Sequence, residues 1–184
     1  MENETKVPVV KGAIKSGVII GLISILITLI VYLASPDLFA VWWFGICLIV
    51  LIIVLVTVFG VKFRNANTGY LSFGQSFLYC WLSFVVAGLF GSIFSILLYE
   101  VIDPDLPNFI INESIKNTAE IMRGFGANEA SLDLQIEQME KDLPANFQVG
   151  GIIKNFFIMA VVYAVISLIT GLIVKKNEPI EDFV

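Results

Sequence analysis

Four long apolar stretches leave this chain few options outside a lipid bilayer. They cover residues 12–33, 39–61, 76–99 and 152–174, and none contains an Asp, Glu or Arg. About 20 helical residues cross the hydrocarbon core of a bilayer, so each stretch is long enough to span it. Hydrophobic residues make up 58% of the chain, more than a soluble core of this size can bury. We therefore expect an all-α integral membrane protein with four transmembrane helices in a single domain, residues 1–184.

The first stretch lies near the amino terminus, where a cleaved signal peptide would also lie. Its apolar core, residues 17–33, exceeds the roughly 7–15 apolar residues of a signal peptide. Its end, Tyr32-Leu33-Ala34, has a tyrosine where a cleavage site requires a small residue. We expect this stretch to be retained as the first transmembrane helix.

Basic residues are unevenly divided among the segments that join the four stretches. The connection 34–38 has none, and the segment between Asp103 and Asp142 has three bases against nine acids. Because positive charge favours the cytoplasmic side of a membrane, the pattern predicts that both termini are cytoplasmic. The cytoplasmic bases are Lys6, Lys11 and Lys15 before the first stretch, Lys62 and Arg64 after the second, and Lys175 and Lys176 after the fourth.

Aromatic residues at two expected boundaries agree with this topology. Trp42 and Trp43 lie at the outer end of the second stretch, and Tyr70 and Phe73 lie in the inner polar connection before the third. Trp and Tyr are enriched at such interfaces. In the inner connection, Ser72 is a candidate N-cap for the third helix.

Small side chains recur every three or four positions in three of the stretches. Within lipid, helices associate through close packing of small residues and a few polar contacts. Two uses of these faces stay open: packing within the bundle, which we favour, and an interface with a second copy or a partner. The second stretch has no such face, and we expect it to be the most lipid-exposed. The packing candidates are Gly17, Gly21 and Ser24 in the first stretch, Ala87 and Gly91 in the third, and Ala160, Ala164 and Gly171 in the fourth.

Residues 102–148 are too many for a plain loop and predict an extracytoplasmic, amphipathic helical hairpin. Asn128 or Ser131 is expected to cap its second helix, and Pro144 to end that helix. The apolar faces either pack against each other, which we favour, or meet a partner, since the acidic hairpin suits anionic headgroups poorly. The faces are Ile111, Ile115, Thr118 and Met122 in the first helix, and Leu132, Ile136, Met139 and Leu143 in the second.

Groups that carry catalysis or bind metals and cofactors are scarce in this sequence. It has no histidine, and its net charge of −5 disfavours nucleic acid as a partner. Glu137, Glu140 and Asp142 lack the spacing of a calcium loop and fit an exposed helix face. Asp103 and Asp105 are the carboxylates expected nearest the outer interface, but they flank a proline, as in a turn. We expect no catalytic residue, no metal site and no cofactor.

A set of short motifs covers nearly the whole chain. It comprises Gly12, Gly17 and Gly21, the segments 69–76 (Gly-Tyr-Leu-Ser-Phe-Gly-Gln-Ser), 102–105 (Ile-Asp-Pro-Asp) and 137–141 (Glu-Gln-Met-Glu-Lys), and a final Lys-Lys. Together these motifs resemble a bacterial family, abundant in Bacteroidota, that is known as domain of unknown function 4199. The family has no established activity, so the resemblance implies a multi-pass protein of the bacterial inner membrane without a mechanism. In gene order, its members look like neighbours of polyprenyl-phosphate glycosyltransferases, which implies such an enzyme as a partner.

Three functions stay open on this basis. A non-catalytic scaffold or accessory subunit of a membrane complex agrees with the scarcity of catalytic groups, the small-residue faces and the hairpin. A small oligomeric transporter or channel usually has ionisable groups at mid-membrane, whereas these stretches offer Ser, Thr, Cys and Gly. A lipid-acting membrane enzyme would have to rely on Asp103 and Asp105. We favour the first of these functions.

Overall fold

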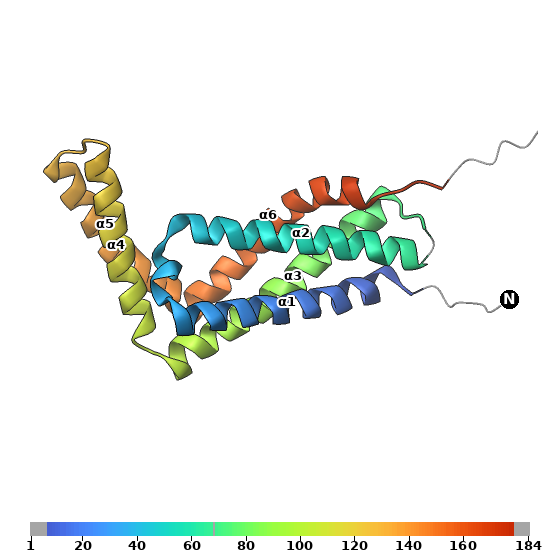
Figure 1. Cartoon of the computed structure of the whole chain (residues 1–184), viewed down its shortest axis with the longest axis horizontal. Helices are drawn as coiled ribbons and strands as arrows, with labels where there is room; N and C mark the ends of the chain where they lie inside the picture. The colour runs from blue at the N-terminus through green and yellow to red at the C-terminus, as the bar shows by residue number, and fades with distance from the viewer. Residues whose placement is uncertain (1–6, 68, 179–184) are drawn as a thin grey trace, which may run out of the picture. The chain divides into compact units, whose positions relative to one another are not determined.

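The computed structural model describes residues 7–67 and 69–178, so Lys6 lies outside the described part. Within it the chain forms six α-helices, and four of them are long and apolar enough to cross a membrane (Figure 1). The prediction of an all-α protein with four candidate spans is confirmed. The elements are α1 (Val9–Ala34), the 3-10 helix η1 (Pro36–Ala40), α2 (Trp42–Asn67), α3 (Phe73–Leu97), the π-helix η2 (Leu98–Ile102), α4 (Leu106–Gly124), α5 (Glu129–Phe147) and α6 (Val149–Val174).

The second candidate span ends later than its apolarity predicted. We expected residues 39–61, but α2 continues to Asn67. Its last, polar turn has partners elsewhere in the chain: Arg64 Nη1 donates to the Val174 carbonyl at 2.8 Å, and Asn67 Oδ1 accepts from the Val7 N–H at 2.9 Å. Hydropathy does not detect such tertiary hydrogen bonds, so the predicted end of the second span came too early.

The candidate spans also begin at shifted positions. α2 begins at Trp42 rather than at residue 39, because Pro36 opens the 3-10 helix η1 ahead of it and the fixed φ of proline suits a first helical turn. α1 and α6 begin at Val9 and Val149, ahead of their apolar stretches. The added residues are Val9, Val10 and Lys11 in α1 and Val149, Gly150 and Gly151 in α6.

The start of α3 is fixed by a reciprocal pair of side-chain hydrogen bonds. The Gln75 N–H donates to Ser72 Oγ at 3.3 Å, and the Ser72 N–H donates to Gln75 Oε1 at 3.1 Å. This is a capping box, which satisfies two backbone donors that the helix cannot pair internally. The prediction that Ser72 caps the third helix is confirmed. Just before it, Gly69 has a φ of +75°, a conformation that glycine adopts without steric cost.

The contacts divide the chain into two compact units. Each of the four candidate spans contributes a part to both units, and the expected single domain stays a prediction. The described residues of unit 1 are 7–24, 49–67, 69–90 and 158–178, and those of unit 2 are 25–48 and 91–157.

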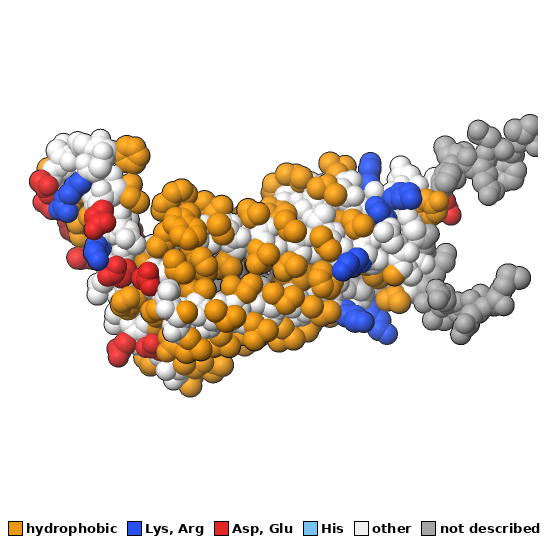
Figure 2. All heavy atoms as spheres, viewed as in Figure 1, with side chains coloured by type: hydrophobic (Ala, Val, Ile, Leu, Met, Phe, Trp, Pro, Cys, Tyr) orange, Lys and Arg blue, Asp and Glu red, His pale blue; other side chains and the backbone are white. Residues whose placement is uncertain are grey.

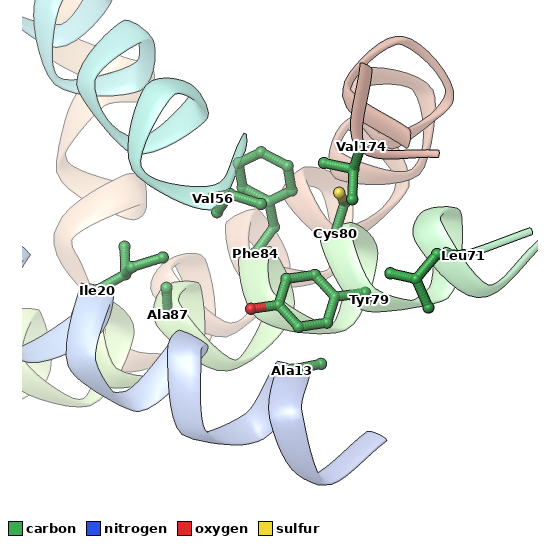
Figure 3. Close-up of a cluster of buried hydrophobic side chains, with 9 residues drawn as sticks. All are labelled: Ala13, Ile20, Val56, Leu71, Tyr79, Cys80, Phe84, Ala87 and Val174. Carbon is green, nitrogen blue, oxygen red and sulfur yellow. The ribbon is translucent and has the colours of Figure 1, made fainter. Parts of the chain in front are cut away.

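The core of unit 1 is built from α1, α2, α3 and α6. In Figure 3, the Tyr79 side chain extends from α3 with its hydroxyl directed toward α1. The Tyr79 ring stacks on Phe63 with centroids 4.8 Å apart, and Phe84 stacks on Tyr163 at 5.3 Å. Such aromatic pairs add about 0.5–1.5 kcal/mol beyond the burial of their surface. The buried cluster consists of Ala13, Ile20, Val56, Leu71, Tyr79, Cys80, Phe84, Ala87 and Val174.

Unit 2 has its own smaller core, in which α4 packs against η1. Leu98, Leu106 and Ile110 are buried there, and the rings of Tyr99 and Phe147 meet edge to face at 5.4 Å. α4 also packs along α5. The residues of the two apolar faces are buried or half-buried in this hairpin, which agrees with the mutual packing that we favoured for them.

The second hairpin helix begins as expected but ends later. Asn128 Oδ1 accepts a hydrogen bond from the Ser131 N–H at 2.8 Å, so Asn128 is the N-cap of α5. The expectation that Pro144 ends this helix is wrong, because α5 continues to Phe147. A proline removes one backbone donor, here the one that would bond the Glu140 carbonyl. Glu140 is exposed, and water can replace that donor.

Hydrophobic side chains cover most of the visible surface of the long helices in Figure 2, whereas acidic side chains gather on α4 and α5. Within its most apolar window, α2 has 11% of residues buried, against 22% in each of the other candidate spans. The prediction that the second span is the most lipid-exposed is confirmed for contacts within this chain.

Candidate functional site

The glycines of α1 allow it to pack closely on α3 in unit 1. A Cβ at Gly17 would lie 2.7 Å from Val86 Cβ and 2.8 Å from the Ser83 carbonyl oxygen. A Cβ at Gly21 would lie 2.8 Å from Phe90 Cβ. These distances are shorter than real Cβ contacts, so only glycine fits without movement of α3. In this structure the Gly17–Gly21 face is therefore occupied by a helix of the same chain.

The other packing candidates on α1 and α3 differ in how closely they approach a neighbouring helix. Ala87 is buried, with its Cα 3.4 Å from a Cβ placed on Gly21. Ser24 is half-buried, and its Oγ donates to the Ile20 carbonyl of its own helix at 2.9 Å. A Cβ at Gly91 would meet nothing within 4 Å. The structure thus brings Ala87 to the α1–α3 contact and places no close helix approach at Gly91.

The candidates on α6 lie along its contact with α3. A Cβ at Gly171 would be 3.2 Å from the Phe77 backbone. The Ala160 carbonyl accepts a hydrogen bond from Trp81 Nε1 at 3.0 Å, and Ala164 is half-buried. The Trp81 indole N–H thus has a backbone carbonyl of α6 as its acceptor. This hydrogen bond stabilises the α3–α6 contact in addition to the packing of small residues.

Two buried hydrogen bonds made by hydroxyl groups join α1 to α3. Ser16 Oγ and Tyr79 OH are 2.6 Å apart, and Ser83 Oγ donates to the Ala13 carbonyl at 3.2 Å. Each bond pairs a polar group that lipid cannot solvate, which is the polar contact expected between membrane helices.

Two further serines are buried without such a pair. Ser76 on α3 and Ser167 on α6 have hydroxyls with no hydrogen-bond partner among the described residues. A serine acts as a nucleophile when a neighbouring base takes its proton. The described helical residues of unit 1 include no Asp or Glu, and the sequence has no His.

The carboxylate of Asp103 anchors the start of α4 in unit 2. Its Oδ1 accepts from the N–H groups of Asp105 at 3.2 Å and Leu106 at 3.1 Å. Its Oδ2 accepts from the Tyr32 hydroxyl at 3.0 Å. Both oxygens are thus engaged by the chain itself, as the turn interpretation of Asp103 and Asp105 expected. The π-helix Leu98–Ile102 that precedes them was not expected from the sequence.

The α4–α5 hairpin leaves large apolar and acidic side chains exposed. Phe125, in the turn between the helices, is 89% exposed, and Leu134 on α5 is 63% exposed. Gly126, next to Phe125, has a φ of +80°, which lets the turn close tightly. The exposed acids of α5 are Glu129, Asp133, Glu137, Glu140 and Asp142.

A groove of about 350 Å³ lies in unit 2 between α4 and the start of α2. Trp42, which is 68% exposed, and Trp43 line one side, and Ile121 lines the other. The Asn117 side chain donates to the Ala40 carbonyl at 3.4 Å and ties α4 to η1 beside this groove. Exposed aromatic side chains beside an amphipathic helix are typical of an interaction surface.

The connection between α2 and α3 meets both ends of the described chain within unit 1. Leu71 and Lys176 exchange two backbone hydrogen bonds, of 2.9 and 3.0 Å. The Asn67 amide pairs with the Val7 backbone in both directions, at 2.9 and 3.1 Å. These hydrogen bonds border an open cavity of about 540 Å³, which we call the connection pocket. It is lined by residues 7–9, 67, 70–72, 75 and 176–178.

No local pattern in the sequence indicates the connection pocket. Segment 69–76 and the final Lys-Lys are separate motifs of the family resemblance. Their contact depends on how the four helices between them fold. One signal was available, because the expected topology puts both motifs on the same side of the membrane. Lys176 Nζ lies 5.3 Å from the centre of the Tyr70 ring, a cation–π contact.

Among residues 7–67 and 69–178, no three Cys, Asp or Glu side chains come together in a way that could hold a metal ion. The fold and these sites define a multi-pass, α-helical membrane protein. Over residues 15–176 the sequence matches the family described as "Protein of unknown function (DUF4199)". The chain therefore belongs to this family, and the resemblance noted in its motifs is confirmed. No curated protein and no solved structure matches the chain.

Proposed function

We propose that this protein is a non-catalytic scaffold or accessory subunit of a complex in the bacterial inner membrane. The observation that carries the proposal is the surface of the α4–α5 hairpin. Of the large apolar side chains that it exposes, Phe125 and Leu134 are the most exposed. An isolated hairpin gains nothing from exposing these side chains to water, whereas a partner that covers them gains buried apolar area.

The charge of the hairpin defines the chemistry of that partner. Glu129, Asp133, Glu137 and Glu140 recur every three or four residues of α5 and are exposed, so they lie on one side of the helix. A surface with this charge is repelled by anionic lipid headgroups and complements a basic protein surface. We infer that the partner presents basic residues around an apolar recess on the outer side of the membrane.

The proposed topology puts the hairpin outside the cytoplasm and both termini inside. It is supported by Lys62 and Arg64 at the end of α2 and by Lys175 and Lys176 after α6. Positive charge beside a span favours the cytoplasmic side.

The proposal that the protein is not an enzyme is supported by how its polar groups are engaged. Both oxygens of Asp103 accept hydrogen bonds from the chain itself. The buried hydroxyls of Ser16 and Tyr79 pair with each other. Neither set of hydrogen bonds joins a nucleophile to an adjacent base.

Site-specific photo-crosslinking in the native membrane tests this proposal. A photoreactive residue at Leu134 or Phe125 is expected to give one discrete crosslinked product with a membrane protein. The same residue at Leu51, which is exposed on α2, is the matched control and is expected to give none. The resemblance makes a polyprenyl-phosphate glycosyltransferase the first identity to examine by mass spectrometry of the product.

The acidic side of α5 supplies a second arm of this experiment. The Glu137→Gln/Glu140→Gln variant is expected to weaken the Leu134 crosslink several-fold, because it removes charge complementarity without touching the α4–α5 contact. If Leu134, Phe125 and Leu51 all gave the same products, or none, the hairpin would not be a partner surface and the proposal would fail.

A second candidate, a small oligomeric transporter, is favoured by one observation. Ser76 and Ser167 are buried with hydroxyls that have no partner among the described residues. Buried, unpaired polar groups are costly and often mark sites that a ligand occupies. Flux measurements in proteoliposomes test this function: uptake that is lost in the Ser76→Ala/Ser167→Ala variant would support it, and no uptake of common ions and metabolites would eliminate it.

A further inference from the structure

The connection pocket is formed in advance of any ligand. Its walls come from three segments that are distant in the sequence. Backbone hydrogen bonds join Leu71 to Lys176, and the Asn67 side-chain amide pairs with the Val7 backbone. The capping box between Ser72 and Gln75 fixes the third wall. Ligand sites are usually largely preformed in this way, and a volume of about 540 Å³ lies within their usual range.

Apart from the Glu178 carboxylate and the Asn177 amide, three polar side chains in these walls offer donors to a ligand. Gln75 Oε1 and Ser72 Oγ already accept from each other's backbone N–H, and the Asn67 amide is used on both sides by Val7. These donors are the Ser72 O–H, the Gln75 side-chain N–H groups and the ammonium of Lys176. Such a set binds the oxygens of an anion, and phosphate oxygens accept several donors at once.

The charged side chains of the pocket differ in sign. Lys176 is seated beside the Tyr70 ring, and the Glu178 carboxylate also lines the cavity. A pocket for an anion alone would be weakened by that carboxylate. A ligand with both a phosphate and an ammonium group satisfies the two side chains together.

The apolar part of the pocket and its place in the chain indicate a lipid. Val7, Val9 and Leu71 line it beside the polar groups. It lies where the candidate spans α2 and α6 end and α3 begins, which is a membrane boundary whichever way the protein is oriented. Basic pockets at a membrane boundary bind the phosphate groups of lipids, and Lys176 supplies such a basic group here.

We propose that the connection pocket binds the phosphoethanolamine headgroup of a glycerophospholipid. Lys176, Ser72 and Gln75 hold the phosphate, and Glu178 accepts from the ammonium. The inference is independent of the proposed partner, because it concerns unit 1 whereas the proposed partner surface lies in unit 2.

Native mass spectrometry of the whole chain, released from detergent micelles that contain phosphatidylethanolamine, tests this proposal. The wild-type chain is expected to retain one such lipid in a saturable way. The Lys176→Gln variant is expected to bind it about tenfold more weakly, since a charge-assisted hydrogen bond is lost, and Lys176→Arg is expected to restore binding. Lys175→Gln is the matched control, because Lys175 carries the same charge outside the pocket lining, and its affinity is expected to stay within about twofold.

Three further arms can overturn the proposal. Equal losses in Lys176→Gln and Lys175→Gln would reduce the effect to general charge attraction. Competition by soluble phosphoethanolamine or inorganic phosphate as strong as by the lipid would make the ligand soluble rather than membrane-bound. The Glu178→Gln variant is expected to shift preference from phosphatidylethanolamine toward phosphatidylglycerol, and an unchanged preference would remove the ammonium contact. Matching thermal melting curves for all variants separate loss of the lipid from loss of the fold.

Discussion

The hydroxyls of Ser16 and Tyr79 are 2.6 Å apart and join α1 to α3 inside the core of unit 1. The same Tyr79 ring stacks on Phe63 of α2, so one side chain links three helices. The ring and the hydroxyl can be separated by mutation, because phenylalanine keeps the stack and loses only the bond.

The Tyr79→Phe variant is expected to lower the free energy of unfolding by about 1 kcal/mol, within the range for side-chain hydrogen bonds between membrane helices. Unfolding in mixed detergent micelles measures this change. The double variant with Ser16→Ala is expected to cost little more than either single change, since the two hydroxyls bond each other. Tyr163→Phe is the matched control: Tyr163 stacks on Phe84 without such a hydroxyl pair, and a loss equal to that of Tyr79→Phe would contradict the assignment.

Gly17→Ala is expected to destabilise the protein by about 1–3 kcal/mol, because the added methyl group meets Val86 and the Ser83 carbonyl and overpacks the contact. Gly91→Ala makes the same chemical change where a Cβ meets nothing within 4 Å. Its effect is expected to be within about 0.5 kcal/mol. The same unfolding assay compares the two variants, and similar losses for both would show that the α1–α3 contact is not as close as described.

At Asp103, substitution is expected to affect the start of α4 rather than any reaction. Asp103→Ala removes the acceptor for Asp105 and Leu106 and is expected to cost about 1 kcal/mol, as for other lost caps. Hydrogen exchange of the first turn of α4 in lipid nanodiscs measures the loss. Asp103→Asn keeps one carbonyl acceptor and is expected to preserve most of the protection and full cellular function. Loss of cellular function in Asp103→Asn, with normal protection, would instead indicate a catalytic carboxylate.

The proposed topology is expected to be visible by thiol labelling in intact spheroplasts. In a Cys47→Ser/Cys80→Ser background, a membrane-impermeant maleimide is expected to label the Gln138→Cys variant on α5. It is expected to label Asn177→Cys, beside the final Lys-Lys, only after the membrane is opened. Both positions are exposed, so a difference between them reports the side of the membrane. The reverse pattern would contradict the positive-inside argument.

Local features of the fold were predictable from the sequence, because their causes lie within a few residues. Apolar length indicated the candidate spans, and residue spacing indicated the hairpin helices. Ser72 and Asn128 are caps whose partners lie three residues along the chain. Pro144 misled the prediction because an exposed helix tolerates the loss of one backbone bond.

The contacts that form the candidate sites were not predictable in the same way. The polar last turn of α2 has the composition of a connection. It is helical in the structure, where Arg64 donates a hydrogen bond to the Val174 carbonyl. The bonds between Leu71 and Lys176 join residues separated by two candidate spans and the hairpin, and no local pattern records such a pair. A stripe of small residues also does not reveal which helix covers it, which is why Gly17 and Gly91 looked alike in sequence and differ in space.

The pairing of Leu71 with Lys176 also sets an order of events during synthesis. Lys176 leaves the ribosome only after α6 has been made, so the connection between α2 and α3 has no strand-like partner while the first three spans are being inserted. Until then the Leu71 backbone groups and the Arg64 guanidinium depend on water or lipid headgroups. The connection pocket is therefore completed last, and a nascent chain that stalls before α6 does not contain it.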